Sequence, residues 1–213
     1  MENAIGTADL ENRIAAIFRK AGLADGQAAA MARNLAAAER DGCKSHGIYR
    51  IEGCLKTVLA GKADPLAVPQ LHDDGGGVIR VAAKGGFSSW AFSRGAPLLA
   101  ERAKRLGVAA LVINDCVHLT ALWPEIEDLT ADGVAAMAMC PSYATVAPAG
   151  GSRPLLGTNP LAIAVPGERS TFLLDMATTA TSHGTIKTYR DAGRAMPEGW
   201  VVGADGEPIT DPG

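Results

Sequence analysis

The sequence predicts an α/β protein, with a helical segment over residues 1–62 and an α/β region over 63–213. Apolar residues recur at helical spacing through the first segment, which is typical of amphipathic helices. In the second region, short apolar runs of strand length alternate with helical stretches. A connection over residues 63–77 that contains Pro and Gly separates the two regions and marks the expected boundary.

Three helices are expected in the first segment. The apolar face of the first helix consists of Leu10, Ile14, Ile17 and Phe18. Gly22 can end this helix, because glycine adopts the left-handed conformation at little cost. Asp25 is expected to cap a second, Ala-rich helix that runs toward Arg40. A third helix is expected to start at Ser45 and to end near Gly61.

The second region is expected to hold the sheet. Strands are predicted over residues 78–81, 108–113, 134–139, 161–165 and 172–174. Helices are predicted over 90–106 with Pro97 inside it, from Pro124 with Leu122, Ile126 and Leu129 as its buried face, and over 180–192. The strand, helix and strand over 108–139 are typical of a βαβ unit with parallel, buried strands. Asp205-Gly206 indicates a hairpin near the end of the chain.

Composition argues against several classes of function. The formal net charge of −3 leaves no basic excess to bind nucleic acid electrostatically. No apolar run is long enough to cross a membrane, and residues 1–4 lack the layout of a signal peptide. The four cysteines form no C-x-x-C pair, so they read as reduced thiols and not as a metal site. We therefore expect a cytoplasmic protein without nucleic-acid or membrane partners.

The stretch Ser45-His46-Gly47-Ile48-Tyr49-Arg50 is the strongest candidate for chemistry. In a helix, His46 and Arg50 share a face because they are four residues apart. A cation that can hold a carboxylate would then lie beside a group that can move a proton, which suits an enzyme acting on a small anion. A purely structural alternative remains, in which Ser45 is a helix cap and His46 is a solvated surface residue. In that alternative Arg50 pairs with Asp41 or Glu52.

Three further polar clusters follow predicted strands. They cover residues 114–120 with His118, the Gly-rich loop 147–160 with Thr158, and residues 175–179 with Asp175. Ligands of open α/β sheets bind at such strand ends, where glycines allow close approach. The structural alternatives are a buried histidine, a turn-rich connector, and a cap on the segment after Asp175. Neither a G-x-G-x-x-G pattern after a first strand nor a P-loop is present, which argues against a standard Rossmann domain.

Taken together, these motifs resemble one family. D-G-x-x-S-H-G-x-x-R over 41–50, G-T-N-P over 157–160 and D-M-A-T over 175–178 are similar to the malate/L-lactate dehydrogenase family of the second type. The elements P-x-G-W over 197–200 and T-D-P over 210–212 extend the resemblance along the chain. It implies an NAD(P)H-dependent oxidoreductase, an α/β fold specific to the family and distinct from the Rossmann fold, and a homodimer.

Within this family, the chain is most similar to the branch that reduces cyclic ketimines. Residues 118–125 read H-L-T-A-L-W-P-E and resemble that branch's His-Phe-Ala-Ala-Leu-Trp-Pro stretch. Ala144 and Thr145 stand before Val-Ala-Pro, where the hydroxy-acid branch often has a lysine. The resemblance implies reduction of Δ1-piperideine-2-carboxylate to L-pipecolate and of Δ1-pyrroline-2-carboxylate to L-proline. The alternative is a 2-hydroxy acid dehydrogenase of the malate or lactate type, acting on a 2-oxo acid.

The resemblance also implies roles for individual residues. His46 would supply a proton and Ser45 would orient it, with a helix N-terminus disfavouring the imidazolium. Arg50 and Thr158 would bind the substrate. The cofactor, NADPH with NADH as a possibility, would contact His118, Leu119, Thr120, Ala121, Leu122, Asp175, Met176 and Ala177.

The chain departs from the family pattern in two places. The ketimine branch has an Asp directly after the His-Gly that follows D-M-A-T, whereas here Thr185 follows His183-Gly184. The chain also stops at Gly213, shorter than family members, so we expect its C-terminal part to be missing. Two other classes of function stay open: a remnant that binds cofactor without turnover, and a Ser-His hydrolase, although Ser45 lies in no G-x-S-x-G elbow.

Overall fold

A computed structural model describes residues 5–213. Residues 1–4, on which the expectation about a signal peptide rests, lie outside the described residues. The N-terminal part contains helices α1 (Thr7–Lys20), α2 (Asp25–Arg40) and α3 (Arg50–Leu59), with the 3-10 turn η1 (Lys44–His46) before α3. Phe18, Met31 and Leu35 are buried where α1 packs against α2. Gly22 follows α1 with φ +92°, which confirms it as the helix stop.

Asp25 does not cap α2, contrary to the expectation. The N-cap position is Ala24, and no side chain there bonds to the first turn. The Asp25 carboxylate accepts instead from Arg19 Nε at 2.8 Å, which ties the end of α1 to the start of α2. An arginine one turn before the connection competes for the carboxylate, and a cap pattern cannot reveal this.

The first sheet has three strands in the order β1 (Gln70–His72), β2 (Val78–Ala82) and β3 (Ala110–Asn114). Strand β1 is antiparallel to β2, and β2 is parallel to β3. Helix α4 (Ser88–Leu106) joins the two parallel strands and packs on them both, so β2, α4 and β3 form the βαβ unit of this protein.

The second sheet shows that the βαβ unit expected over 108–139 is wrong. After helix α5 (Trp123–Ala131), strand β4 (Ala136–Met139) pairs with β5 (Leu161–Val165), and β5 pairs with β6 (Phe172–Met176), all antiparallel. Strand β4 therefore does not join the sheet of β3. Burial alternates along β4, which explains this pairing. Ala136 and Ala138 pack toward α5, whereas Met137 and Met139 are exposed. A strand buried on one face is typical of antiparallel sheets.

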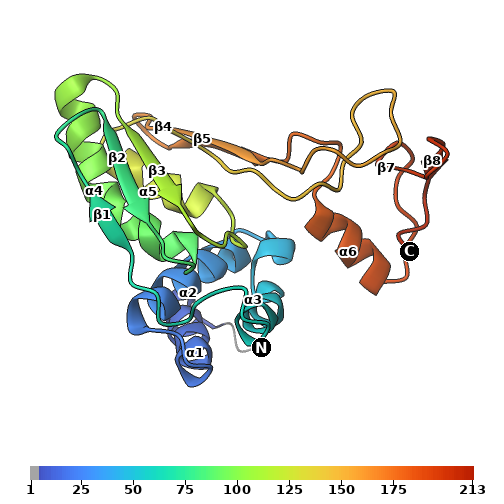
Figure 1. The fold of residues 1–213 in the computed structure, drawn as a ribbon, viewed down its shortest axis with the longest axis horizontal. Helices are drawn as coiled ribbons and strands as arrows, with labels where there is room; N and C mark the ends of the chain where they lie inside the picture. Colours follow the sequence, from blue (N-terminus) through green and yellow to red (C-terminus); the bar gives the residue numbers. More distant parts are fainter. Residues whose placement is uncertain (1–4) are drawn as a thin grey trace.

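The C-terminal part returns to the helical segment. The second sheet leads away from the N-terminal body, and α6 (His183–Asp191) then lies beside η1 and α3 (Figure 1). The hydroxyl of Tyr49 donates to Asp191 Oδ2 at 2.6 Å. Strands β7 (Val201–Val202) and β8 (Pro208–Ile209) form the expected hairpin, with Gly206 at φ +89° in its turn.

Buried amides connect the helical segment to the α/β region. Gln27 on α2 donates to the carbonyls of Asp64 and Pro65 at 2.9 and 2.7 Å, and its oxygen accepts from the Phe87 amide at 2.9 Å. The core around α1 and α2 also includes Phe87. The division at residue 62 stays a prediction, because the two regions share this core.

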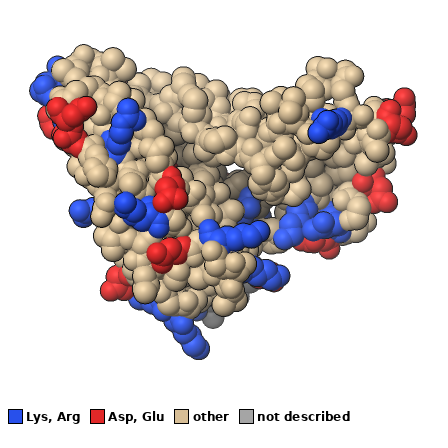
Figure 2. Space-filling model, viewed as in Figure 1, with Lys and Arg blue, Asp and Glu red and all other residues tan. Residues whose placement is uncertain are grey.

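The surface carries both signs of charge. Acidic and basic side chains are scattered over the face in Figure 2, and most of that face is uncharged. All four cysteines are free, as the sequence predicts. Among residues 5–213, no helix combines the length and apolarity that crossing a bilayer requires.

Candidate active site

The segment with Ser45 and His46 is a 3-10 turn and not the start of an α-helix. Helix α3 begins only at Arg50, with Tyr49 in the N-cap position and no side-chain cap, so the reading of Ser45 as a helix cap is wrong. Gly47 separates the turn from the helix with φ −88° and ψ −138°. A Cβ at this position would overlap the Glu39 carboxylate, which accepts from the Ile48 amide, so a larger residue would displace that carboxylate.

The turn nevertheless brings His46 and Arg50 into contact. Arg50 Nη2 lies 3.2 Å from His46 Nε2, and Arg50 Nε donates to the Ser45 carbonyl at 2.8 Å. A guanidinium can only donate hydrogen bonds, so His46 Nε2 must accept. The proton of the neutral imidazole therefore sits on Nδ1, which donates to Ser45 Oγ at 3.0 Å. This bond supports the expectation that Ser45 orients His46.

The surroundings of His46 disfavour its charged form. Burial is the largest cause, followed by the positive charge of Arg50 and by His118, and together they lower the pKa of His46 to about 4. The expected direction is correct, but the expected cause is not, because α3 starts four residues after His46. At neutral pH the imidazole of the free protein is uncharged.

Arg50 pairs with neither carboxylate that the structural alternative offers. Asp41 forms an ion pair with Arg40 at 2.6 Å and accepts from the Trp123 indole, whereas Glu52 pairs with Lys56. Within residues 5–213, no carboxylate lies in ion-pair range of Arg50. Burial lowers the pKa of this half-buried guanidinium. A desolvated cation without a protein carboxylate is typical of a site for a ligand anion.

His118 belongs to the same group of side chains. Its Nδ1 lies 2.7 Å from Ser88 Oγ, whereas its Nε2 is buried without a hydrogen-bond partner among the described residues. Burial is the largest effect on the pKa of His118; the Thr120 backbone opposes it and the charge of Arg50 adds to it, and the net result is a pKa of about 4. One ring nitrogen thus has a structural partner, and the other is available to a ligand.

The backbone of the segment after His118 is hydrogen-bonded to side chains from two other elements. Asn34 on α2 donates to the Ala121 carbonyl at 2.9 Å and accepts from the Ala121 amide at 3.2 Å. Asp175 Oδ2 accepts from the amides of Leu122 and Trp123 at 2.9 and 3.1 Å. Asp175 therefore caps the start of α5. The structural alternative, in which Asp175 caps the segment after Asp175 itself, is wrong. These bonds join two of the predicted cofactor segments, 118–122 and 175–177.

The G-T-N-P and D-M-A-T motifs also lie together. The Thr178 amide donates to the Thr158 carbonyl at 2.9 Å, and Thr178 Oγ1 donates to the Asn159 carbonyl at 3.1 Å. Gly157 packs so closely on the Ser142 carbonyl that a Cβ would overlap it. Within the described part of the chain, no hydrogen bond joins the Thr158 side chain to Arg50, so its role in substrate binding stays a prediction.

Thr185 does not take the place of a relay carboxylate. Its amide donates to Ser182 Oγ at 3.0 Å, which caps α6, and its hydroxyl lies 2.9 Å from the same oxygen. Gly184 faces the Ser45 and Arg50 side chains, and a Cβ at this position would lie 3.2 Å from Arg50 Nη2, which is a tight contact. Among the hydrogen bonds of residues 5–213, the partners of His46 Nδ1 are Ser45 Oγ and Cys43 Sγ, at 3.0 and 3.7 Å.

Sequence reasoning missed a buried carboxyl group beside the site, that of Glu125. Glu125 Oε1 accepts from Ser89 Oγ at 2.9 Å, and Ser89 Oγ lies 3.1 Å from Thr120 Oγ1. Burial is the largest effect and raises the pKa of Glu125. The hydrogen bond from Ser89 lowers this pKa and the charge of Asp175 raises it, and the net result is about 7. A signal was present, since Glu125 lies three residues after Leu122 and four before Leu129, on the apolar face of α5.

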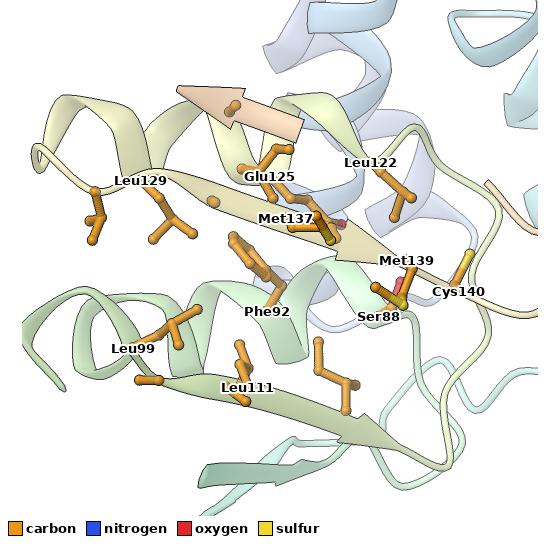
Figure 3. A pocket seen from close by; sticks show the side chains of 18 of the residues that line it. Ser88, Phe92, Leu99, Leu111, Leu122, Glu125, Leu129, Met137, Met139 and Cys140 are labelled. Atoms are coloured by element: carbon orange, nitrogen blue, oxygen red, sulfur yellow. The ribbon is translucent and has the colours of Figure 1, made fainter. Parts of the chain in front are cut away.

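Glu125 borders a cavity of about 1020 Å³ that lies between α4 and β3 on one side and α5 and β4 on the other (Figure 3). Labelled side chains that line it include Phe92, Leu99, Leu111, Leu129, Met137 and Met139. The lining of the cavity includes Ser88, Cys116 and His118, where it reaches the candidate site. His46 and Arg50 do not line it. Within the described residues, no three His, Cys, Asp or Glu side chains converge as a metal site requires.

The sequence is similar to those of known proteins. The chain is 56% identical over 205 residues to Δ1-pyrroline-2-carboxylate reductase of Agrobacterium fabrum, covering 95% of this chain and 59% of that protein. It is 47% identical over 196 residues to Δ1-pyrroline-2-carboxylate/Δ1-piperideine-2-carboxylate reductase of Pseudomonas aeruginosa, covering 92% of this chain and 59% of that protein. This chain therefore spans less than two thirds of the length of either relative.

The fold is likewise similar to solved structures. Δ1-Piperideine-2-carboxylate reductase from Pseudomonas syringae pvar. tomato superposes with a TM-score of 0.94 at 36% identity, over 99% of this chain and 64% of that structure. Malate dehydrogenase from Entamoeba histolytica gives a TM-score of 0.91 at 24% identity, over 98% of this chain and 58% of that structure, which shows a shared fold. The malate/L-lactate dehydrogenase family matches residues 5–213, and the chain belongs to this family.

Proposed function

We propose that the protein reduces a cyclic imino acid with a nicotinamide cofactor, as an oxidoreductase acting on C=N. The observation that carries the proposal is Arg50, a half-buried cation that pairs with no carboxylate of residues 5–213 and contacts the imidazole of His46. Such a pair suits a substrate with a carboxylate next to the group that must be protonated. The names of the similar reductases, at 56% and 47% identity, support an imine over a 2-oxo acid.

The residues around His118 fit a nicotinamide cofactor. His118 Nε2 is a buried polar atom without a partner among the described residues, and a ligand with a polar group would satisfy it. We expect residues 118–122 and 175–177 to hold NADPH, with NADH as the alternative, outside a Rossmann fold. The cofactor, when bound, supplies the hydride for the imine carbon. The functional enzyme is expected to be a homodimer.

The side chains of this chain perform the remaining steps. Arg50 forms a bidentate, charge-assisted pair with the substrate carboxylate, and Thr158 adds a hydrogen bond. His46 gives a proton to the imine nitrogen, because an iminium is the better hydride acceptor. Ser45 Oγ fixes the imidazole through Nδ1 at 3.0 Å, so Nε2 is the nitrogen that faces the substrate.

The experiment is NADPH oxidation with Δ1-piperideine-2-carboxylate and Δ1-pyrroline-2-carboxylate, run beside pyruvate and oxaloacetate. We expect turnover on the imines alone and a loss of about 10²–10⁴-fold in His46→Ala, the range that general acid–base catalysis spans. His72→Ala, at an exposed position on β1, is the matched control and should retain activity. Turnover on the keto acids alone would assign the protein to the hydroxy-acid type. A remnant that binds cofactor predicts no turnover on any of the four compounds.

A further inference from the structure

The arrangement of His46 and Arg50 poses a problem for proton donation. His46 Nε2 accepts a hydrogen bond from Arg50 Nη2 at 3.2 Å, so the nitrogen that faces the substrate carries no proton. The permanent charge of the guanidinium also opposes a second proton on the same ring. In this arrangement His46 cannot act as an acid toward a substrate nitrogen.

Resting on the function proposed above, we propose that binding of the substrate carboxylate causes His46 to become protonated. By pairing with Arg50, the carboxylate draws Nη2 away from His46 Nε2 and neutralises the neighbouring charge. The freed Nε2 then takes one proton from solvent and holds it toward the imine nitrogen. Binding of the anionic substrate and charging of the acid are thus one coupled event.

The contacts of Arg50 allow this exchange without displacing the helix. Nε remains bonded to the Ser45 carbonyl at 2.8 Å, which anchors the guanidinium while Nη2 changes partner. Gly184 at the start of α6 lies beside the same guanidinium, so its lack of a side chain leaves space next to Nη2. Because the guanidinium is a rigid plane, Nη2 leaves the imidazole by a rotation of the whole group about its Nε anchor.

The groups of the described residues that face His46 and Arg50 include no carboxylate, so we assign the negative charge to the ligand. Around His46 lie Arg50, the neutral His118, and the hydroxyl and thiol of Ser45 and Cys43. The titratable groups around Arg50 are Cys54 and Tyr143, and Tyr49 and Cys43 have smaller effects on its pKa. None of these groups is a carboxylate. Burial and the charge of Arg50 lower the pKa of His46 to about 4 in the free protein, and a carboxylate that offsets the charge of Arg50 raises it.

Coupling of this kind makes the carboxylate a requirement for chemistry as well as for binding. A neutral imine that entered the site would leave Arg50 on His46, and the acid would remain without its proton. The site thus selects 2-carboxylates at the step of proton transfer.

The test measures protons taken up when an unreactive ligand binds. Pyrrole-2-carboxylate is planar and anionic and accepts no hydride, and pyrrole-2-carboxamide is its neutral counterpart. Calorimetry of the protein, with and without NADP⁺, in buffers of different ionisation enthalpy yields the number of protons bound per ligand. We expect uptake approaching one proton for the carboxylate and none for the carboxamide. Between pH 5.5 and the pKa of His46 in the complex, Kd should rise by up to tenfold per pH unit.

Variants assign the proton to His46. His46→Gln should still bind the carboxylate but without proton uptake, whereas His118→Gln and the exposed control His72→Gln should keep it. In parallel, ¹⁵N-histidine spectra of the unmodified protein should show the His46 resonances titrating at a higher pH in the complex. This second measurement does not depend on the folding of any variant.

Several results would overturn the coupling. They are tight carboxylate binding without proton uptake, uptake that persists in His46→Gln, and equal affinity for the carboxamide. Failure of the proposed reaction would look different, because the imines would then not be reduced although proton uptake occurred. Reduction of the imines with an unmoved His46 titration would leave the reaction standing and refute the coupling.

Discussion

Among single residues, Glu125 places a carboxyl group in an apolar environment, and this has a consequence for stability. Its pKa is raised from 4.5 to about 7, so the folded state binds its proton more tightly than the unfolded state. Stability therefore falls as pH rises from about 4.5 to 7, and the full cost is present above pH 7. Glu125→Gln keeps an acceptor for Ser89 and removes the charge. It should be more stable than the parent by up to about 3 kcal/mol at pH 8.

Urea unfolding at a series of pH values measures this difference. The gap between Glu125→Gln and the parent should shrink as pH falls and vanish near pH 4.5. Glu198→Gln, at an exposed position, is the control and should show no such trend. A gap that is independent of pH would mean that Glu125 is not protonated in the folded protein at neutral pH.

Arg50 is expected to depend on its forked shape as well as on its charge. Its Nε donates to the Ser45 carbonyl, and its Nη2 contacts His46 Nε2. Lysine would keep the charge but could not bridge both partners. We predict that Arg50→Lys raises KM for the cyclic imine by about tenfold or more, the cost of one charge-assisted hydrogen bond. Steady-state kinetics test this, and an unchanged KM would remove Arg50 from the carboxylate site.

Between elements, Asn34 links helix α2 to the segment that precedes α5. Both groups of its amide bond the backbone of the buried Ala121, at 2.9 and 3.2 Å. Asn34→Ala would leave one N–H and one C=O unsatisfied in the interior, which costs about 2–4 kcal/mol for the pair. Asn12→Ala, exposed on α1, is the matched control and should cost less than about 1 kcal/mol. Chemical denaturation measures the free energy of unfolding of both variants. Equal losses of stability in Asn34→Ala and Asn12→Ala would show that water replaces the Asn34 amide.

The elements also show what sequence patterns can and cannot predict. The bounds of α1 and the buried face of α5 were predictable because apolar spacing and Gly22 act locally, whereas α3 begins at Arg50 and not at the predicted Ser45. Strand pairing was not, because β4 has the same apolar character whether its partner is β3 or β5. What distinguishes the two cases is the exposure of one face of β4, which depends on where α5 packs.

The candidate site divides in the same way. The residue types in Ser45-His46-Gly47 and Arg50 were sufficient to predict a proton-moving group next to a cation, and the structure places the two in contact. The 3-10 turn was not predictable, since Gly47 lies against Glu39 of a different helix, and sequence spacing does not reveal that contact. The cap that Asp175 provides to α5 likewise joins residues that are more than fifty positions apart.

At the scale of the whole molecule, the cavity between the two sheets affects how the 213-residue chain behaves in solution. Strands β3 and β4 are end strands of their sheets among the described strands, and both border the cavity. Met137 and Met139 are 60% and 68% exposed there. Open strand edges beside exposed apolar side chains are sites of association between chains. We therefore expect this chain to self-associate as its concentration rises.

A charge placed on this face should weaken that association. In Met139→Lys, the ammonium would have to be desolvated wherever another chain packs on β4, so the apparent mass at a given concentration should fall. Leu59→Lys is the matched control, because Leu59 is 86% exposed on α3, away from the cavity. Sedimentation velocity over a range of concentrations distinguishes the variants. Weaker association in Leu59→Lys than in Met139→Lys would place the contact on the helical segment, and a monomer at all concentrations would show that the edges of β3 and β4 attract no second chain.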